Sequence, residues 1–255
     1  MATIGVLHPG EMAAAVGAVL AGAGHEVVWA SAGRSDATAA RAAAFADVGT
    51  VAELAARCDT ILSVCPPHAA LDVAREVAGF GGVFVDANAV SPATTRAVGE
   101  IVEAGGATFV DGGIVGSPPR GAGETRLYLS GAAAAPVARL FDGTIVAAPV
   151  LSDRIGDASA MKMVYAAWTK GSAALLLAIR GVARTSGLEE ELVTAWDDTI
   201  PGLTAQSEHA ARSAAAKGWR WEFEMEEIAA TFAGAGLPDG FHRAAAEMFR
   251  RAADG

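Results

Sequence analysis

The sequence predicts an α/β protein in which a doubly wound parallel sheet is followed by a long helix and an all-α C-terminal domain. In the first 154 residues, short apolar runs typical of strands alternate with helical runs. From Gly156 the strand-like runs disappear, and helical periodicity continues almost to the end of the chain. The first strand, helix and second strand are complete by Ala30, which is the expected size of a βαβ unit. We therefore expect two domains, residues 1–154 and residues 155–255.

The strands of the predicted sheet are short runs rich in aliphatic and β-branched residues. We expect them at Thr3–Leu7, Glu26–Ala30, Thr60–Cys65, Val83–Asp86, Thr108–Asp111, Arg126–Ser130 and Thr144–Pro149. Helices are expected between them at Glu11–Ala23, Asp36–Ala46, Ala69–Val77 and Pro92–Ala104, with another starting at Thr50. The sequence T-V-A-E from Thr50 matches a capping box that Glu53 closes, which indicates the start of that helix.

The C-terminal domain is expected to be entirely helical. The expected helices are Asp157–Ser186, Glu189–Asp197, Leu203–Ala216, Arg220–Ala235 and Phe241–Ala253. Gly187 follows the first of them, at the position where a glycine commonly ends a helix. A long helix followed by a small helical domain leaves apolar faces that two chains can share, so we expect a homodimer.

Composition argues against several classes of function. The formal charge is −10, from 19 basic and 29 acidic side chains without a basic run, which argues against a nucleic-acid-binding protein. The apolar stretches are far shorter than the roughly 20 residues that span a bilayer, and no secretory signal pattern is present, so we expect a cytoplasmic protein without a membrane partner. Neither Cys58 and Cys65 nor the histidines show a metal-binding spacing, so we expect no metal.

The segment from His8 to Ala13 lies between the first strand and the first helix, where a Rossmann domain binds the pyrophosphate of a dinucleotide. At the three glycine positions of the G-x-G-x-x-G fingerprint, this chain has His8, Gly10 and Ala13. Only the middle glycine remains, which is the one that lets the backbone approach the phosphates. An ordinary strand-to-helix turn is the alternative, and the surrounding βαβ pattern favours the dinucleotide site. We expect cofactor contacts from His8, Pro9, Gly10, Glu11 and Met12.

The end of the second strand bears on the choice between NAD and NADP, because NAD-binding domains carry an acidic residue there that binds the ribose diol. This strand runs into W-A-S-A-G-R-S, which contains no acid. Ser31, Arg34 and Ser35 offer hydroxyls and a guanidinium suited to a 2′-phosphate. We therefore expect NADP(H) as the cofactor, with a solvated polar loop as the alternative interpretation.

The carboxyl ends of parallel strands are where such sheets bind ligands. Further cofactor contacts are therefore expected where the third strand ends, from Cys65, Pro66 and His68. His68 could instead simply begin the next helix.

Four segments form a further pattern along the chain. They are H-P-G-E-M-A from His8, D-A-N-A-V-S-P from Asp86, D-G-G-I-V-G-S from Asp111 and A-S-A-M-K ending at Lys162. Together they resemble the β-hydroxyacid dehydrogenase and 6-phosphogluconate dehydrogenase superfamily, especially its short bacterial members with a distinct helical C-terminal domain. The resemblance covers nearly the whole chain. It implies an NADP(H)-dependent dehydrogenase or reductase that transfers a hydride to or from a small oxo- or hydroxy-acid-type substrate.

The resemblance also implies roles for individual residues. Asn88 occupies the serine position of the family segment beside the nicotinamide and the substrate, so the resemblance implies that it contacts the cofactor and has a catalytic role. The usual substrate-binding serine falls on Val115, and Gly116 and Ser117 match the glycine pair that follows. We expect these three residues to contact the substrate, although the valine means that substrate capture must differ from that of the family.

Lys162 matches the catalytic lysine of the family and lies in an otherwise apolar helical segment. Burial lowers the pKa of a lysine, which makes it a better proton donor and acceptor near neutral pH. It would protonate the developing alkoxide in a reduction and remove that proton in an oxidation. Tyr165, one helical turn later where the family has asparagine, could orient Lys162 or supply a second proton, so both are expected to contact the substrate. The alternatives are a snorkelling surface lysine and a core tyrosine.

Two other functions stay open from the sequence. Enzymes of the same architecture reduce imines and vary the lysine position, and Val115 and Tyr165 both replace polar positions around a substrate carboxylate and hydroxyl. The retained Lys162 favours carbonyl chemistry. A module that binds NADP(H) without catalysis is the third possibility, since a fold does not by itself establish a reaction.

Overall fold

A computed structural model describes residues 1–254 of the chain. These residues form two compact units, and the division between the units falls between Lys162 and Met163. The expected boundary at residue 154 lies before this point, because the first turns of a long helix pack with the N-terminal unit. Each unit is described separately below.

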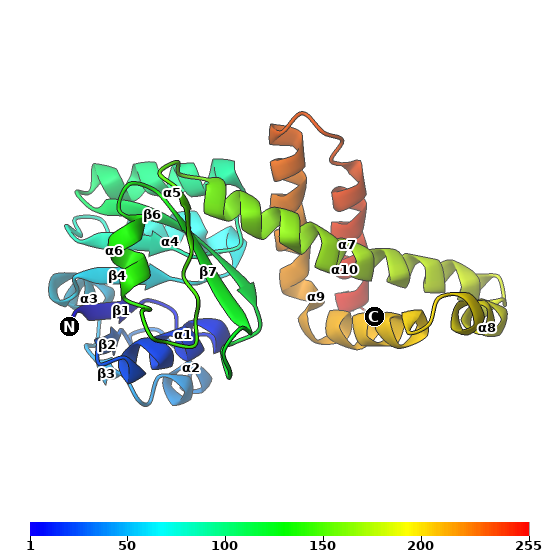
Figure 1. Cartoon of the computed structure of the whole chain (residues 1–255), viewed down its shortest axis with the longest axis horizontal. Coiled ribbons are helices and arrows are strands. Elements are labelled where there is room, and N and C mark those ends of the chain that lie inside the picture. Colours follow the sequence, from blue (N-terminus) through cyan, green and yellow to red (C-terminus); the bar gives the residue numbers. More distant parts are fainter. Residues whose placement is uncertain (255) are drawn as a thin grey trace. The chain divides into compact units, whose positions relative to one another are not determined.

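The N-terminal unit contains an eight-stranded sheet in the order β3-β2-β1-β4-β5-β6-β7-β8 (Figure 1). The strands are β1 Thr3–Val6, β2 Glu26–Trp29, β3 Ala46–Asp47, β4 Thr60–Ser63, β5 Val83–Asp86, β6 Thr108–Gly116, β7 Thr125–Ser130 and β8 Val150–Ser152. In this order, the six strands β3, β2, β1, β4, β5 and β6 are all parallel. Strand β7 is antiparallel to β6 and parallel to β8. The order 3-2-1-4-5-6 confirms the expected doubly wound Rossmann sheet.

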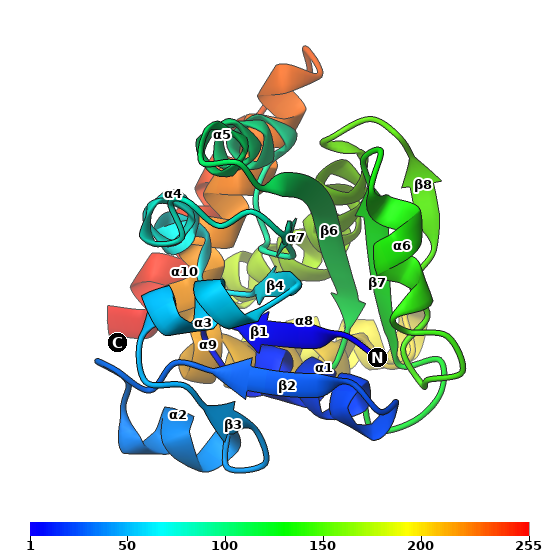
Figure 2. The same ribbon diagram turned by 90° about the vertical axis from the view of Figure 1, so that its left-hand side faces the viewer.

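Helices cover both faces of this sheet (Figure 2). They are α1 Glu11–Gly22, α2 Asp36–Arg41, α3 Val51–Arg57, the 3₁₀ helix η1 Pro67–Ala69, α4 Ala70–Glu76, α5 Pro92–Ala104 and α6 Ala134–Arg139. The expected capping box at the start of α3 is present, with Thr50 and Glu53 exchanging side-chain and backbone hydrogen bonds. Helices on opposite faces require strand residues that alternate between two apolar cores.

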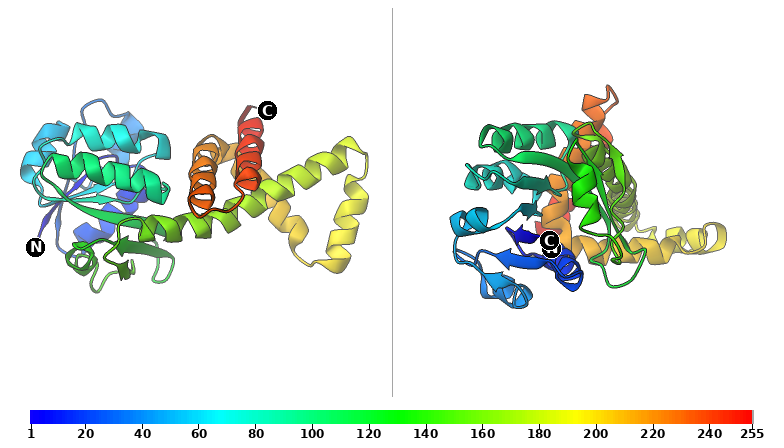
Figure 3. Two further views of the ribbon diagram at one scale, coloured as in Figure 1. Left: turned by 90° about the horizontal axis from the view of Figure 1, so that it is seen from above. Right: turned by 60° about the vertical axis from the view of Figure 1, so that its left-hand side comes forward.

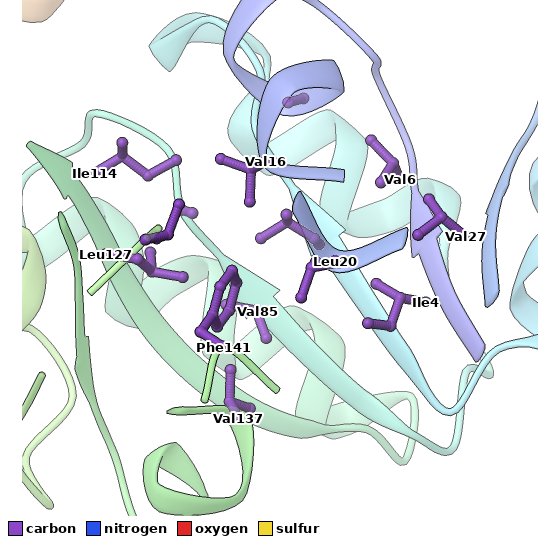
Figure 4. Close-up of a cluster of buried hydrophobic side chains, with 14 of the residues drawn as sticks. Ile4, Val6, Val16, Leu20, Val27, Val85, Ile114, Leu127, Val137 and Phe141 are labelled. Carbon is purple, nitrogen blue, oxygen red and sulfur yellow. The ribbon is translucent and has the colours of Figure 1, made fainter. Parts of the chain in front are cut away.

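The two cores follow that alternation along each strand. Ile4 and Val6 of β1 pack with α1 and α6 in one core, which is drawn in Figure 4. Ile61 of β4 and Phe84 of β5 belong to the second core, beneath α3, α4 and α5. Gly5, between Ile4 and Val6, faces the second core, where a Cβ atom would lie 2.5 Å from Leu54 Cδ2. Gly5 is therefore a packing residue of the sheet.

Two expected elements of the N-terminal unit were wrong. The helix expected at Asp36–Ala46 ends at Arg41, because Ala46 and Asp47 form β3 and pair with Val28 and Trp29. The strand expected at Thr144–Pro149 is β8 at Val150–Ser152, although Ala147 makes an isolated bridge to Arg126 of β7 and Pro149 accepts a hydrogen bond from Leu129 N. The Thr144 hydroxyl lies 2.8 Å from the carbonyl oxygen of Phe141 and 3.2 Å from that of Val146, which holds the start of the segment in a turn.

The C-terminal unit is helical, as expected. Its helices are the main part of α7 Asp157–Thr185, then α8 Glu189–Thr199, α9 Leu203–Gly234 and α10 Gly240–Asp254. Helices α9 and α10 run side by side (Figure 3). The break expected between Ala216 and Arg220 was wrong, because α9 continues through Gly218, which is buried. A glycine inside a helix costs only about 1 kcal/mol relative to alanine, which packing can offset.

Candidate active site

The carboxyl ends of β1, β4 and β5 lie next to one another in the sheet, because these strands are consecutive neighbours and parallel. The chain reverses its winding direction between β1 and β4, which is the place where doubly wound sheets bind ligands. The segments that follow these strands carry three of the expected contact residues, His8, Cys65 and Asn88. The fold thus brings together residues that are 80 positions apart in the sequence.

Gly10 gives the turn after β1 an open surface. It is the N-cap residue of α1 and has an extended backbone, with φ −67° and ψ 179°, that any residue could adopt. A Cβ atom on Gly10 would meet only the carbonyl oxygen of His8, at 3.9 Å. The fold itself therefore does not need a glycine here. A phosphate that approaches the first turn of α1 does need one, and the positive end of the helix dipole favours an anion at that place.

His8 replaces the first glycine of the fingerprint without backbone strain, since no non-glycine residue in the described chain has a positive φ. Its ring is largely buried, and burial, together with the nearby charge of Arg34, lowers its pKa to about 4. His8 is therefore neutral at physiological pH. Its Nδ1 is buried and lacks a hydrogen-bond partner within residues 1–254. A buried polar atom without a partner is costly, and a bound ligand could satisfy it.

The third glycine of the G-x-G-x-x-G fingerprint allows the helix to pack closely on the sheet, and in this chain two residues of α1 share that role. Ala13 is buried and packs under the sheet, as its small methyl group allows. One turn later, a Cβ atom on Gly17 would lie 2.8 Å from Phe45 Cζ and 3.3 Å from Val6 Cγ2. Gly17 therefore takes over the close approach between α1 and the sheet. The sequence interpretation missed this residue, and its only signal was a glycine inside a helix.

The loop after β2 contains an arginine with one buried nitrogen that lacks a hydrogen-bond partner. The Nε of Arg34 is buried without a hydrogen-bond partner in the described chain, and its Nη2 lies 3.9 Å from the Glu76 carboxylate. Ser35 is the N-cap residue of α2, and its hydroxyl accepts a hydrogen bond from Thr38 N at 3.3 Å. Ser31 donates its backbone N–H to Asp47 Oδ1 at 3.2 Å. Of the three expected residues, Arg34 is the one whose polar group most needs a ligand.

Two charged residues, one at this loop and one at the turn after β1, were missed by the sequence interpretation. Asp47 comes from β3, and hydrogen bonds from Ser31 and Gly49 lower its pKa, so its carboxylate is charged. It brings an acid beside the loop that carries none of its own. Arg41, at the end of α2, donates its Nε to the carbonyl oxygen of Pro9 at 3.1 Å. Neither residue has a local sequence signal, because the neighbouring strand and helix place them here.

Asn88 lies at the ends of two strands, and its side chain is buried. Its Oδ1 accepts a hydrogen bond from Cys65 N at 2.6 Å, and its Nδ2 donates to Ser63 Oγ at 3.4 Å and to the Asp86 carboxylate. These contacts tie the carboxyl end of β4 to that of β5. Asn88 thereby fixes the backbone at the candidate site.

The other expected residues after β4 have simpler environments. Burial raises the pKa of the Cys65 thiol to about 12, with a further contribution from Asp86, so this thiol is not a nucleophile at neutral pH. Pro66 is the N-cap residue of η1, and the exposed His68 lies within that short helix. His68 thus lies inside a short helix that begins one residue earlier, at Pro67, after the carboxyl end of β4.

The expected substrate segment lies at the end of β6. Val115 is a buried sheet residue paired with Arg126, whereas Gly116 and Ser117 are exposed. Gly116 has φ +111°, and a Cβ atom there would lie 1.9 Å from the carbonyl oxygen of Glu124. Only glycine can occupy this position. Of the three expected substrate contacts, Ser117 alone presents an exposed polar side chain.

Lys162 is held close to β6 by a glycine. A Cβ atom on Gly113 would lie 2.5 Å from the carbonyl oxygen of Ala158 and 3.0 Å from Lys162 Cβ. The first turns of α7 therefore run directly against the strand, and Lys162 is partly buried there. Tyr165 lies one turn later in α7 and is 44% exposed, so it is not a core tyrosine.

A buried acid anchors the start of α7. Asp111 of β6 accepts hydrogen bonds from the backbone N–H groups of Gly156, Ala158 and Ser159 at 2.9 to 3.1 Å. The hydroxyl groups of Ser159 and Ser130 also donate to it, at 2.6 and 2.8 Å. These donors satisfy a carboxylate at the positive end of a helix dipole. The sequence interpretation used Asp111 only as the start of a motif and gave it no role.

The described residues contain no group of three or more histidine, cysteine, aspartate or glutamate side chains placed to hold a metal ion. Within the same residues, no helix has both the length and the apolar character needed to cross a bilayer.

Two family models match the chain. Residues 3–141 match the NAD binding domain of 6-phosphogluconate dehydrogenase, and residues 183–252 match a domain of unknown function, DUF1932. An uncharacterised 28.5 kDa protein from Methanothermus fervidus is 31% identical over 148 residues. That alignment covers 58% of this chain and 57% of the relative, so the chain aligns with little more than half of that protein.

Solved structures share the fold over the whole chain. A conserved protein of unknown function, itself described as similar to 3-hydroxyacid dehydrogenases, is 28% identical with a TM-score of 0.71, covering 99% of this chain and 97% of the other. A 3-hydroxyisobutyrate dehydrogenase from Salmonella typhimurium is 17% identical with a TM-score of 0.76, covering 100% and 95%. A reductive aminase from Aspergillus terreus, in complex with NADPH and ethyl levulinate, is 17% identical with a TM-score of 0.63, covering 100% and 94%.

Proposed function

Because the chain belongs to the family of the NAD binding domain of 6-phosphogluconate dehydrogenase, we propose that it is an NADP(H)-dependent oxidoreductase. Its substrate would be a small molecule with an oxo or hydroxy-acid group, and Lys162 would be the acid and base. The observation that carries this proposal is the approach of α7 to β6 at Gly113, which holds Lys162 beside the strand that leads to Ser117. The solved structure of a protein of unknown function, 28% identical in sequence to this chain, is described as similar to 3-hydroxyacid dehydrogenases, which supports the substrate class.

The N-terminal unit offers groups that fit a dinucleotide. The open surface at Gly10 and the first turn of α1 would receive the pyrophosphate. The buried Nδ1 of His8 and Nε of Arg34 are both without partners within the described chain and would gain them. Pro9, Glu11 and Met12 complete this turn, and Cys65, Pro66 and His68 would border the cofactor after β4.

NADP(H) is proposed over NAD(H) because of the guanidinium groups. Arg34 has an unpartnered buried Nε, and Arg41 holds a second positive charge against the same turn. Arginine binds a phosphate through several charge-assisted hydrogen bonds, so a 2′-phosphate fits this environment. The Asp47 carboxylate, which accepts a hydrogen bond from Ser31 N, would repel the 2′-phosphate. Binding of NADPH and NADH to the same protein measures which of these charges dominates.

When bound, the nicotinamide supplies or accepts the hydride. Lys162 would donate a proton to the substrate oxygen as that oxygen becomes an alkoxide, and would remove the proton in the reverse direction. Asn88 would keep the ends of β4 and β5 in place, and Ser117 would offer a hydroxyl to the substrate. Tyr165, on the same helix as Lys162, would orient the lysine or the substrate.

Imine reduction is a second candidate because of Val115. This buried valine stands where the related enzymes use a serine to hold a substrate carboxylate. A hydroxy acid would bury its carboxylate there without that hydrogen bond, which costs more binding free energy than burying an apolar imine. The reductive aminase structure shares the fold. Lys162 favours the carbonyl reaction. A carbonyl oxygen is only weakly basic and needs a positioned proton donor, whereas an imine nitrogen is basic enough to be protonated without a lysine.

The decisive experiment measures NADPH oxidation with a panel of oxo acids, ketones and cyclic imines, and NADP⁺ reduction with β-hydroxy acids. We expect Lys162→Met to lower kcat by 100-fold or more, in the range of general acid–base catalysis. Lys217→Met, at an exposed position of α9, is the matched control. Unchanged turnover of Lys162→Met contradicts the role of the lysine. NADPH binding without turnover on any substrate would instead identify a non-catalytic module.

We also propose that the protein is a homodimer. In the C-terminal unit, α7 exposes Leu175, Ile179 and Val182, the last with 68% of its surface accessible. A groove of about 610 Å³ lies beside Ile179 and Val182, and it is lined almost entirely by apolar atoms. Exposed apolar surface of this kind commonly marks an interface between subunits. Light scattering should give a mass of twice 25.7 kDa, and Val182→Glu should lower it to one chain. A monomeric wild-type protein at micromolar concentration contradicts the dimer.

A further inference from the structure

Two buried carboxyl groups lie side by side beneath the start of α7. Asp86 of β5 and Asp111 of β6 are register partners in adjacent parallel strands, and they are 1% and 0% exposed. Thr95 of α5 lies between them, with its Oγ1 3.5 Å from Asp86 Oδ2 and 3.4 Å from Asp111 Oδ1. The groups that hydrogen-bond these carboxyls in the described chain are hydroxyls, an amide and backbone N–H groups. Two like charges in such an environment repel each other strongly.

The two carboxyl groups have unequal hydrogen-bond environments. Asp111 accepts hydrogen bonds from three backbone N–H groups of the α7 start and from two serine hydroxyls, which stabilise its charged form. Asp86 accepts hydrogen bonds from Nδ2 and the backbone N–H of Asn88, and its Oδ2 faces Thr95. Burial, and then the charge of Asp111, raise the pKa of Asp86 to about 8. The neutral form of Asp86 therefore predominates at physiological pH.

Proton counting at Thr95 leads to the same arrangement. The threonine hydroxyl has one hydrogen and can donate to only one of the two carboxyl groups at a time. If Asp86 Oδ2 carries a proton, Asp86 donates to Thr95, and Thr95 donates to Asp111. Each of the two contacts then contains one hydrogen, and the single negative charge rests on Asp111. No such arrangement exists when both groups are ionised.

We propose that Asp86 and Asp111 form a pair that holds one proton through Thr95, and that the pair is a positioning device for Lys162. The neutral Asp86 allows Asp111 to remain the anion that binds Gly156, Ala158 and Ser159. These residues form the start of α7, and Lys162 follows Ser159 by one turn of the same helix. The packing of Ala158 and Lys162 against Gly113 transmits the position of the helix start to the lysine backbone.

Cys65 is a titratable group beside Asp86, and the charge of Asp86 raises its pKa further above that of an ordinary thiol. Cys65 therefore stays protonated over the range in which Asp86 titrates. On the α7 side, the permanently charged Arg96 guanidinium lies against Gly156, where Nη1 would be 2.8 Å from a Cβ atom. Ionisation of Asp86 would place a second negative charge next to Asp111 and weaken the anchor of α7. The pair thus predicts that the start of α7 loosens at alkaline pH.

The test follows the proton directly in the full-length protein. With aspartate labelled by ¹³C at Cγ, the NMR titration should show one carboxyl group that stays protonated at pH 6.5 and ionises near pH 8, and Asp86→Asn should remove that signal. Asp142→Asn, at an exposed position, should leave it unchanged. Titration of every aspartate below about pH 5 overturns the proposal.

Hydrogen exchange tests the anchor. Asp111→Asn should speed exchange of the Gly156, Ala158 and Ser159 amides by tenfold or more, whereas Asp86→Asn should retain their protection because its carboxamide is uncharged. If Asp111→Asn does not fold, Ser159→Ala removes only the 2.6 Å hydroxyl contact and should give a smaller increase at the same amides. Unchanged exchange in folded Asp111→Asn, or in Ser159→Ala when Asp111→Asn does not fold, overturns the positioning role.

The catalytic consequence of this pair rests on the proposed function. In Asp111→Asn or Ser159→Ala, kcat should fall while the Kd of NADPH stays within about twofold, because the cofactor turn is not part of the anchor. In Asp86→Asn, the alkaline decline of kcat should move to higher pH. Neither the NMR titration nor the exchange depends on Lys162 being catalytic, so an active Lys162→Met would contradict the proposed function without changing these two readouts.

Discussion

Arg41 donates a hydrogen bond from its Nε to the carbonyl oxygen of Pro9 at 3.1 Å and holds a guanidinium against the turn after β1. Arg34 lies close enough to His8 for its charge to lower the pKa of that histidine. Two cations therefore meet the turn in a chain with a net charge of −10. A local positive field within an acidic protein attracts an anion to that place.

Arg34 should determine the cofactor preference. Arg34→Ala should weaken NADPH binding by about 10- to 100-fold, which is the range of a lost hydrogen-bonded charge contact, and NADH binding by much less. Calorimetric titration with both cofactors and with 2′,5′-ADP measures this difference. Arg139→Ala, an exposed position of α6, is the control. Equal losses for NADPH and NADH would show that Arg34 does not contact the 2′-phosphate.

Gly113 should be required for activity because of the close approach of α7. Gly113→Ala places a methyl group 2.5 Å from the Ala158 carbonyl oxygen and 3.0 Å from Lys162 Cβ, so the helix must move. We expect kcat to fall at least tenfold, because small displacements of a catalytic group have large effects on rate. Gly22→Ala in α1 is the matched control, since its Cβ would meet nothing within 4 Å. A variant with normal kcat would mean that the position of Lys162 is not critical.

Asp86 should make the folded protein less stable as pH rises from about 4 to about 8. Its pKa is 3.8 in an ordinary environment and about 8 here, so over this range the folded state holds a proton that the unfolded state has lost. The free energy of unfolding should therefore decrease with pH by up to about 1.4 kcal/mol per pH unit from this group. Urea unfolding at pH 5 to 8 should show a flatter profile for Asp86→Asn than for wild type. Parallel profiles would show that Asp86 is ionised in the folded protein.

Lys170 and Glu224 form a buried ion pair at 2.8 Å between α7 and α9 in the C-terminal unit. The Lys170 ammonium also lies 5.8 Å from the centre of the Trp221 ring. Lys170→Met should destabilise this unit by about 3 to 5 kcal/mol, because it removes the ammonium group that compensates the charge of a largely buried carboxylate. Lys170→Met combined with Glu224→Leu should recover much of the loss. Denaturation monitored by tryptophan fluorescence measures both, and additive losses would show that the pair is not coupled.

The sequence predicted the strands from β1 to β7, apart from the two-residue β3 and the second half of β6, because their apolar runs are long enough to reveal a period. Strand β6 continues past the expected end at Asp111 to Gly116, because antiparallel pairing with β7 extends it. The sequence also located the turn at Gly10 between β1 and α1, where we propose that the cofactor binds. It could not locate β8, because local hydrogen bonds of Thr144 hold the preceding apolar segment in a turn. It broke α9 at Gly218, although tertiary packing keeps that helix continuous.

By itself, the sequence determined the fold class, the family resemblance and the candidates Gly10, Arg34 and Lys162, because periodicity and motif spacing are local properties of the chain. Only the tertiary structure decided which side chains meet. It brought Asp47 to the loop after β2 and Arg41 to the turn after β1, and it placed Asp86 beside Asp111. Burial and neighbouring charge set the protonation of such groups, and both depend on segments that are distant in sequence.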